Sequence, residues 1–340
     1  MAILIVTHSQ DNVSPHWVAR ALALRGERVY RFDTDLFPTG LQLSLDERGG
    51  GRLSGPEGVL ALSEISAVWY RRNATGGRIP RELAPRLRNP SVEESRRLVF
   101  GMLAALGVFQ LDALETLRRA EHKPLQLALA RALGLEVPRT LMTNDPEEVR
   151  AFAASCPEGV VTKMMSSFAV HDARGREQVV FTTPLDAREL EELEGLELCP
   201  MTFQERLAKR LELRVTVVGE RVMAAAIDSQ ALPGAREDWR REGLALVDAW
   251  MPYTLPEPVR ARVLGLMDAL GLNYGAFDFI VTPEGRHVFL EVNPAGEFMW
   301  LMRHPGLPID EALADVLTGR EARRLGPKPL AGGSGALTFQ

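Results

Sequence analysis

The segment Tyr274-Gly-Ala-Phe-Asp-Phe-Ile-Val-Thr-Pro-Glu-Gly-Arg-His-Val-Phe-Leu-Glu-Val-Asn-Pro294 is the most informative stretch of this chain for its fold. Two runs rich in β-branched and aromatic residues flank a Pro-Glu-Gly-Arg turn, which is the pattern of a β-hairpin. With the turn centred between Glu284 and Gly285, Asp278 lies directly opposite Glu291. Asn293 then lies on the same face, because side chains alternate along a strand.

Facing carboxylates repel each other, so an uncompensated pair would destabilise the sheet. The amide oxygen of Asn293 beside Asp278 and Glu291 completes a set of hard oxygen ligands of the kind that Mg²⁺ prefers. The pattern therefore predicts a metal site. The alternative is a solvated acidic patch, and a one-residue bulge that turned Asp278 to the other face would remove the site.

The bulk composition is that of a soluble globular protein. With 340 residues, 46% hydrophobic and 25% charged, the chain is long enough for two or three compact units. A net charge of −5 argues against nucleic acid as the main partner. Cys156 and Cys199 have no metal or redox spacing and suit a reducing compartment. No apolar run is long enough to cross a membrane and no signal peptide is visible, so we expect a cytoplasmic protein without a membrane partner.

The first hundred residues alternate strand and helix patterns, which predicts an open α/β sheet. Ligands of such sheets bind beyond the carboxyl ends of the strands. We also expect a hairpin between residues 41–45 and 59–62 and a largely helical segment over residues 91–117. The expected strands are Ala2–Thr7, Arg28–Asp33 and Ile65–Tyr70, with a helix over residues 16–24.

Further along, Asp145 is a suitable N-cap for a helix over Pro146–Ala154. Glu212, Arg214 and Thr216 share the polar face of a strand that turns at Gly219 into a second strand. Helices are also expected over residues 124–133, 185–196 and 259–270, and strands over residues 160–164, 178–182 and 201–205. The residues from Gly326 onward are rich in glycine and predict a flexible tail.

The chain has neither a P-loop nor a dinucleotide fingerprint, so any nucleotide must be held by side chains and metal. Only four of its 40 basic residues are lysines, at positions 123, 163, 209 and 328. Lys123 precedes a helix, Lys163 lies in a strand and Arg214 lies on a polar strand face. Together with the carboxylates, these three cations are the groups needed to hold a triphosphate and its metal.

Taken in order, these residues resemble an ATP-grasp carboxylate ligase over about residues 1–320. The residues that carry the resemblance are Lys123, Lys163, Gln204, Glu205, Arg206, Leu207, Lys209, Arg214, Asp278, Glu291 and Asn293. Val68-Trp-Tyr-Arg-Arg72, Asp238-Trp-Arg240 and Leu290-Glu-Val-Asn-Pro-Ala-Gly-Glu-Phe-Met-Trp300 resemble more narrowly the microviridin-type enzymes, the graspetide macrocyclases.

The resemblance implies an α/β and α+β chain with the ATP-grasp fold, in which two subdomains clamp ATP. Its expected divisions are an N-terminal α/β domain over residues 1–117, a central subdomain over 118–200, a C-terminal subdomain over 201–325 and a flexible tail over 326–340. Arg214 would neutralise the γ-phosphate and the acyl-phosphate intermediate, which makes it the expected catalytic residue. Lys123 and Lys163 would contact phosphates.

The resemblance also implies that residues 204–207 form a hinge whose backbone contacts the edge of the adenine. Glu205 or Lys209 would reach the exocyclic amine of the adenine or the ribose. Asp278, Glu291 and Asn293 would bind one or two Mg²⁺. Five further residues are candidates for substrate contact, with solvated charges and a packed tryptophan as the alternative: Arg71, Arg72, Arg236, Asp238 and Trp239.

The implied activity is ATP-dependent activation of Asp or Glu side chains in a ribosomal precursor peptide, followed by ester or amide formation with Ser, Thr or Lys. The expected cofactors are ATP and Mg²⁺, and the expected partner is the precursor, through its leader and core; a homodimer is left open. A peptide-tailing or amino-acid ligase of the same fold is one alternative. A non-catalytic ATP-binding regulatory module is another, which the complete acidic set and Arg214 disfavour.

Overall fold

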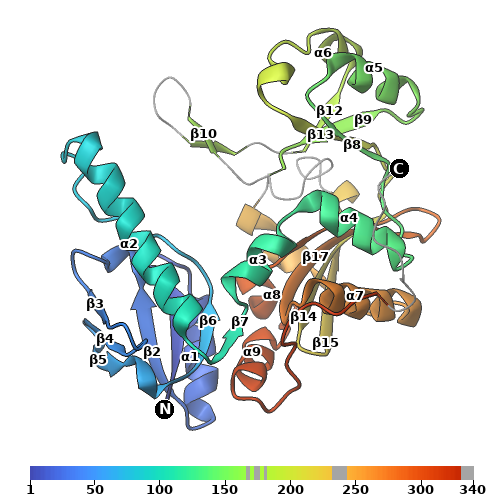
Figure 1. Ribbon diagram of the computed structural model, residues 1–340. Helices are drawn as coiled ribbons and strands as arrows, with labels where there is room; N and C mark the ends of the chain where they lie inside the picture. The colour runs from blue at the N-terminus through green and yellow to red at the C-terminus, as the bar shows by residue number, and fades with distance from the viewer. Residues whose placement is uncertain (166–168, 172–176, 180–181, 232–242, 331–340) are drawn as a thin grey trace.

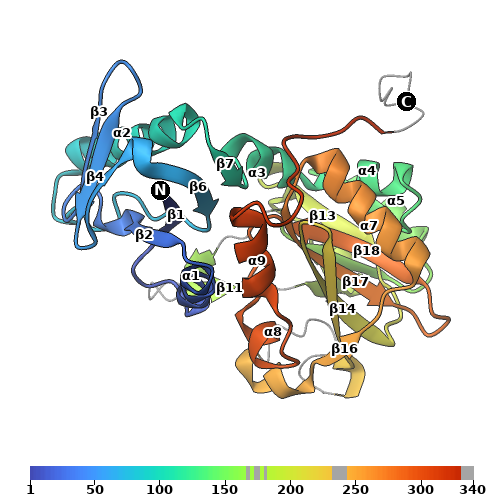
Figure 2. The same cartoon turned by 90° about the horizontal axis from the view of Figure 1, so that it is seen from below.

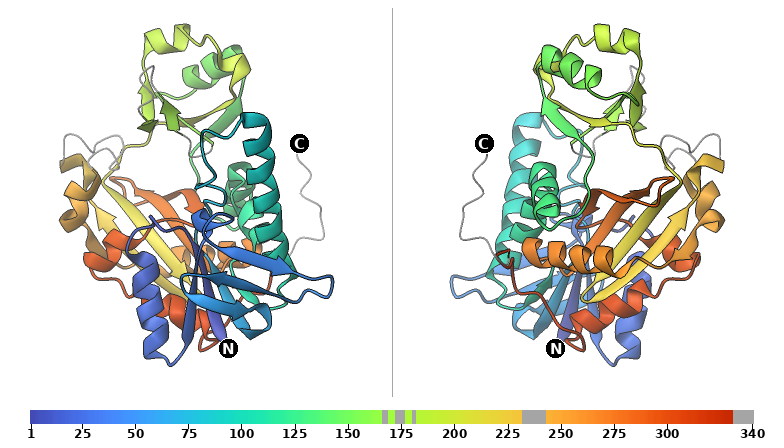
Figure 3. Two further views of the ribbon diagram at one scale, coloured as in Figure 1. Left: turned by 90° about the vertical axis from the view of Figure 1, so that its left-hand side faces the viewer. Right: turned by 90° about the vertical axis from the view of Figure 1, so that its right-hand side faces the viewer.

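The computed structural model describes residues 1–165, 169–171, 177–179, 182–231 and 243–330 (Figure 1). A parallel sheet at the N-terminus and a larger antiparallel sheet near the C-terminus lie side by side in Figure 1. The sheet formed by residues between 140 and 205 stands above both, as the two side views of Figure 3 also show. The mixed architecture agrees with the predicted fold class.

The N-terminal sheet has the order β2-β1-β6-β7 and all its strands are parallel. Alternate residues of β1 enter two different cores, so the sheet is buried on both faces, as its continuous apolar run predicts. The three strands expected here are confirmed. The elements are β1 (Ala2–Thr7), β2 (Arg28–Asp33), β6 (Ile65–Tyr70) and β7 (Phe109–Leu111), with helices α1 (Ser14–Leu24) and α2 (Pro85–Ala105).

Two local predictions in this part were wrong. Residues 41–45 do not pair with 59–62, because β4 (Gly51–Gly55) lies between β3 (Gln42–Leu45) and β5 (Gly58–Ala61) in a three-stranded sheet. The segment 91–117 is not one helix. After α2 ends at Ala105, β7 adds to the parallel sheet, and α3 (Leu114–Ala120) follows. Pairing with β6 decides the conformation of this short apolar run.

The central sheet has the order β12-β9-β13-β8. The Asp145 side chain accepts a hydrogen bond from the Glu147 amide, so the predicted cap is confirmed. The helix expected over residues 185–196 is shorter than predicted, and part of the strand expected over 178–182 lies outside the described residues. The elements are α4 (Lys123–Ala132), β8 (Thr140–Thr143), α5 (Pro146–Ala154), β9 (Val160–Lys163), β10 (Ala169–His171), β11 (Glu177–Val179), β12 (Thr183–Leu185), α6 (Ala187–Glu191) and β13 (Met201–Glu205).

β13 pairs with both β8 and β9, so the central sheet continues past residue 200, the sequence-based boundary, to Glu205. Conversely, α4 packs on the C-terminal sheet, because Leu129 and Ala130 belong to the same core as Val215 and Phe277. The chain therefore crosses between the two units more than once.

The C-terminal sheet has the order β16-β15-β14-β17-β18, with every pair antiparallel. Figure 2 shows α7 and α9 on opposite sides of this sheet. α9 packs between it and the N-terminal sheet in one shared core. The elements are β14 (Leu211–Val218), β15 (Arg221–Ile227), β16 (Met251–Tyr253), α7 (Glu257–Leu270), β17 (Tyr274–Val281), β18 (His287–Asn293), α8 (Met299–Arg303) and α9 (Ile309–Leu317).

The predicted register of the β17–β18 hairpin is confirmed at its functional end. Asp278 pairs with Glu291, and Ala276 pairs with Asn293. Nearer the turn the pairing is shifted by one residue, since Phe279 pairs with Phe289 and not with Leu290 as predicted. A bulge at Leu290 accounts for this shift. Beyond the bulge, Asp278 and Glu291 are directly opposite each other as predicted.

The predicted flexible tail was wrong for its first residues. The Lys328 amide donates to the Asp268 carbonyl at 2.8 Å, and the Lys328 ammonium pairs with the Asp268 carboxylate. Leu330 packs against the core under α7. Residues 331–340 lie outside the described residues. Among the described helices, none is long and apolar enough to cross a membrane.

Candidate active site

Asp278, Glu291 and Asn293 lie together on one face of the C-terminal sheet, as the sequence predicts. The Asn293 amide nitrogen lies 3.4 Å from an Asp278 oxygen. In the described part of the chain no group of three or more His, Cys, Asp or Glu side chains is arranged so that it could hold a metal ion. The set is therefore two carboxylates and an amide, which are oxygen ligands suited to a hard cation.

Each of these carboxylates has a cationic partner. Arg214, directly opposite Asp278 in β14, donates from Nη1 to both Asp278 oxygens at 2.9 and 3.0 Å. Lys123, the first residue of α4, places Nζ 2.6 Å from Glu291 Oε2 and donates to the Met164 carbonyl at 3.2 Å. Arg214 and Lys123 thus supply the positive charge that offsets the repulsion between the two facing carboxylates.

Arg214 is held on several sides. It is 6% exposed, and its guanidinium carbon lies 5.6 Å from the centroid of the Trp300 ring. Burial alone would lower the pKa of Arg214, but the negative charge of Asp278 raises this pKa above its ordinary value. The guanidinium therefore stays charged. A Cβ on Gly296 would lie 2.8 Å from Arg214 Nη2, so only glycine fits there without displacing the cation.

The loop of residues 294–298, which follows β18, is tied to the rest of the site. The Glu297 carbonyl accepts from Arg214 Nη2 at 3.2 Å, and the Gly296 carbonyl accepts from the Tyr274 hydroxyl at 2.7 Å. The Glu297 carboxylate pairs with Arg71 and Arg72. Burial would raise the pKa of Glu297, but these arginines and the Phe298 amide hold it below its usual value.

The 204–209 segment joins the central sheet to the C-terminal sheet. Gln204 is 4% exposed and donates to the Thr140 hydroxyl at 2.9 Å, while Glu205 accepts from the Arg139 amide at 2.9 Å. The Arg206 amide donates to the Gly159 carbonyl, and Lys209 pairs with Glu212 at 3.3 Å. Lys163 ends β9, in register with Thr202 of β13. The segment therefore lies where a hinge between the two sheets is expected.

Two residues that support the site were missed by sequence reasoning. Gln126 of α4 is 2% exposed, and its amide bonds to both the carbonyl and the amide of Val292, between Glu291 and Asn293. Glu297 is the second. A buried polar residue on the apolar face of a helix is a weak signal for the first, and an acidic residue just after the strand is a weak signal for the second.

The candidate substrate residues have different environments. Arg71 is 3% exposed and bonded to the 294–298 loop, whereas the Arg72 side chain is 41% exposed. Arg236, Asp238 and Trp239 lie outside the described residues.

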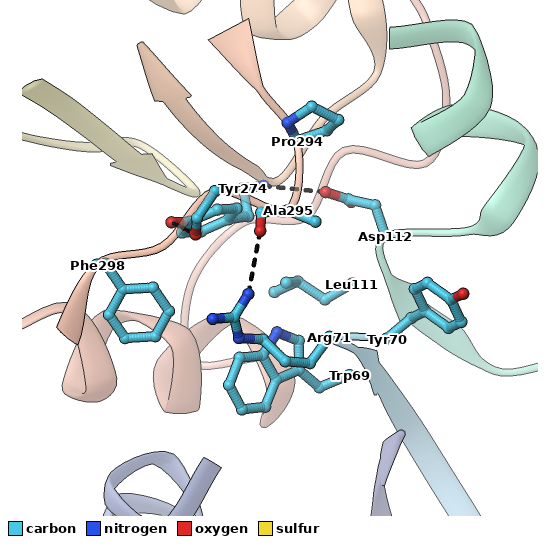
Figure 4. Close-up of a pocket in the computed structure, with 10 residues that line it drawn as sticks. Trp69, Tyr70, Arg71, Leu111, Asp112, Tyr274, Pro294, Ala295 and Phe298 are labelled. Atoms are coloured by element: carbon cyan, nitrogen blue, oxygen red, sulfur yellow. Dashed lines mark hydrogen bonds between the residues drawn. The ribbon is translucent and has the colours of Figure 1, made fainter. Parts of the chain in front are cut away.

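Figure 4 shows the residues that line a small cavity, among them Arg71, Asp112 and Ala295. Its volume of about 10 Å³ has room for roughly one water molecule, so it is not a nucleotide pocket. Burial raises the pKa of Asp112 to about 6, although Asn273 and the Tyr274 amide donate to its carboxylate.

The chain is similar to proteins of one enzyme family over almost its whole length. Residues 2–118 match the MvdD pre-ATP-grasp domain. The macrocyclase MdnC of Microcystis aeruginosa, solved with its precursor peptide MdnA, is 44% identical, with a TM-score of 0.86 over 94% of this chain and 100% of MdnC. The chain is a graspetide-type ATP-grasp ligase.

Other ligases of this family share the fold. A RiPP-associated ATP-grasp ligase of Chryseobacterium gregarium, in complex with ADP and a leader and core peptide, is 38% identical, with a TM-score of 0.90 over 95% of this chain and 98% of the relative. The ligase PsnB, complexed with a minimal precursor, Mg and ADP, is 25% identical, with a TM-score of 0.74 over 94% and 96% of the two chains. No curated protein sequence matches this ligase.

Proposed function

We propose that this ligase uses ATP to phosphorylate Asp or Glu side chains of a ribosomal precursor peptide and joins each acyl phosphate to a Ser or Thr hydroxyl, or a Lys amine, of the same peptide. The observation that carries the proposal is the buried Arg214 held against Asp278, beside Glu291 and Asn293. The precursor peptides bound to MdnC and to the Chryseobacterium ligase support the choice of substrate, through both leader and core.

The residues fit ATP and Mg²⁺. Asp278, Glu291 and Asn293 supply carboxylate and amide oxygens for the metal. Mg²⁺ would supply positive charge to the phosphate oxygens when bound. We assign Lys123 and Lys163 to the phosphates of ATP. We assign the hinge residues Gln204, Glu205, Arg206 and Leu207, with Lys209, to its adenine and ribose.

The chemistry needs no protein nucleophile. A substrate carboxylate oxygen attacks the γ-phosphorus of ATP as the bond between that phosphorus and the ADP oxygen breaks, which gives an acyl phosphate and ADP. The hydroxyl or amine then attacks the acyl carbon, loses its proton to phosphate or solvent, and displaces inorganic phosphate. Arg214 stabilises the charge that develops on the transferring phosphoryl group and on the acyl phosphate. Because its pKa is raised by Asp278, Arg214 remains a cation throughout.

Two other functions remain as alternatives. A peptide-tailing ligase would use the same acyl phosphate but add residues to a free carboxylate. A non-catalytic ATP-binding module has no need to keep Arg214, Asp278, Glu291 and Asn293 together, and their close arrangement disfavours it.

One experiment separates these functions. The protein is incubated with ATP, Mg²⁺ and a peptide encoded beside its gene, and the mass of the peptide is recorded. Loss of one water per crosslink supports the macrocyclase, and added residue masses support the tailing ligase. Absence of ATP consumption with every carboxylate tested would contradict both ligase functions.

Three further assignments belong to the proposal. We place the protein in the cytoplasm, where its two cysteines stay reduced, and cell fractionation tests this. The net charge of −5 leads us to expect no nucleic-acid binding, which a filter-binding assay checks. Light scattering of the purified protein tests whether it forms a homodimer.

A further inference from the structure

Arg71 connects the N-terminal sheet to the active-site loop. It directly follows β6, and its side chain is almost fully buried at 3% exposure. Figure 4 shows the guanidinium directed away from its own sheet, toward Ala295 and Phe298. A side chain just after a strand of the N-terminal sheet therefore contacts the segment that follows β18 of the C-terminal sheet.

The guanidinium makes bonds that define the position of this loop. Arg71 Nη1 donates to the Ala295 carbonyl at 3.0 Å, and Nη2 lies 2.5 Å from Glu297 Oε2. Its central carbon lies 5.6 Å from the centroid of the Phe298 ring. Three of the five loop residues are thus contacted by one planar group, and such a fork fixes orientation as well as distance.

The same loop holds one side of the Arg214 guanidinium, whose other side is bonded to Asp278. Arg214 Nη2 donates to the Glu297 carbonyl, and the Gly296 backbone approaches so closely that an added Cβ would lie 2.8 Å from that nitrogen. Asn293 immediately precedes the loop. A shift of the loop would therefore move both the cation that faces Asp278 and the last residue of the metal set.

We propose that Arg71 is a positioning residue for the ligase reaction: it holds the 294–298 loop and, through Gly296 and Glu297, aligns the Arg214 guanidinium with the transferring phosphoryl group. The inference rests on the proposed function. Arg71 acts through Arg214 and does not contact the substrate, because its Nη atoms are already engaged by the loop and its side chain is buried.

The test compares Arg71→Met with Arg25→Met. Arg25 is a matched control, since it also links the N-terminal unit to the C-terminal one, with Nε 2.7 Å from Asp315 and Nη2 3.1 Å from the Glu311 carbonyl. It lies on the α1–α9 side and does not contact the loop. Turnover, the KM for ATP and a crystal structure are measured for both variants and for Arg71→Lys.

We expect Arg71→Met to lower kcat by about 10²-fold, the usual effect of misplacing a catalytic group by about 1 Å, while the KM for ATP stays near the wild-type value. Arg71→Lys should not restore kcat, because one ammonium cannot span both loop acceptors. Arg25→Met should keep kcat. In the Arg71→Met crystal, Arg214 Nη2 should no longer lie within hydrogen-bond distance of the Glu297 carbonyl.

Unchanged kcat in Arg71→Met, an equal loss in Arg25→Met, or an unmoved Arg214 in the crystal would each overturn the proposal. Should Arg71→Met fail to fold, Arg71→Lys carries the same measurements. A wild-type protein without turnover would contradict the proposed function alone. The crystallographic position of Arg214 would still decide the role of Arg71.

Discussion

At the scale of single residues, the site is an arrangement of balanced charges. Asp278 is paired with Arg214, and Glu291 is paired with Lys123. All four side chains are at least partly buried, so removing one leaves its partner in a poorly solvated position. Each cation should therefore have a separate and measurable role.

Replacing Arg214 by Met should lower the rate of ADP release by about 10²–10³-fold, because a preorganised cation facing the developing charge is lost. Arg221→Met is the control: Arg221 lies on the neighbouring strand β15 and binds Asp315 instead. It should keep the wild-type rate. A rate for Arg214→Met close to that of the wild type would remove Arg214 from the mechanism.

Replacing Lys123 by Met should strengthen Mn²⁺ binding in the absence of nucleotide by about tenfold, or about 1.4 kcal/mol, because Glu291 loses its competing cation. The affinity for the ADP complex of the metal should fall, since a phosphate contact is lost. Electron paramagnetic resonance titration measures both. Lys328→Met, which only breaks an ion pair with Asp268, should change neither. Weaker metal binding without nucleotide would contradict this role of Lys123.

At the scale of secondary-structure elements, α4 supports the strand that carries the acidic residues. The Gln126 side chain takes the place of a neighbouring strand at Val292, bonding both its amide and its carbonyl. The bulge at Leu290 then sets the register that brings Glu291 opposite Asp278. The geometry of the site therefore depends on one helix and one irregularity in β18.

Gln126→Leu should destabilise the protein by about 1–3 kcal/mol, because the buried backbone groups of Val292 lose their partners. Urea unfolding should show a lower midpoint with an unchanged slope. Gln42→Leu, at an exposed position of β3, serves as the control and should leave the midpoint in place. An unaltered midpoint for Gln126→Leu would show that water replaces the amide at no cost.

At the scale of the whole molecule, the N-terminal and C-terminal sheets are joined by a shared core and by buried polar contacts. Asp112, just after β7, accepts from the amides of Asn273 and Tyr274 at the start of β17. Asn273 in turn donates to the Arg324 carbonyl. The beginning of the strand that carries Asp278 is thus attached to the N-terminal unit.

This attachment should make stability depend on pH. The pKa of Asp112 is about 6 in the folded protein and 3.8 as its ordinary value, so between these values the folded state binds the proton more tightly. The stability that Asp112 contributes through this tighter proton binding is fully present below about pH 3.8 and is lost as the pH rises through about 6. The unfolding free energy of the wild type, relative to Asp112→Asn, should fall by at most about 3 kcal/mol from pH 4 to pH 7. Urea titrations across this range check it, and a difference independent of pH would refute it.

Much of the fold was readable from local patterns. A continuous apolar run predicted β1, short runs of β-branched and aromatic residues predicted β2, β6 and the β17–β18 hairpin, and the Asp145 cap predicted the start of α5. Errors arose where pairing between distant segments overrode local preference, as at β7, or where a strand intervened unnoticed, as at β4. The contacts of residues 326–330 were missed because they too are made with a distant segment, at Asp268.

The sequence by itself determined which chemical groups this ligase has and which face of its strand carries them, because side-chain alternation is a property of neighbouring residues. Tertiary structure alone decided that Lys123 meets Glu291, that Gln126 closes the edge of β18 and that Arg71 holds the loop beneath Arg214. These contacts join elements far apart in the chain. Their geometry depends on how whole sheets and helices pack, which no local pattern records.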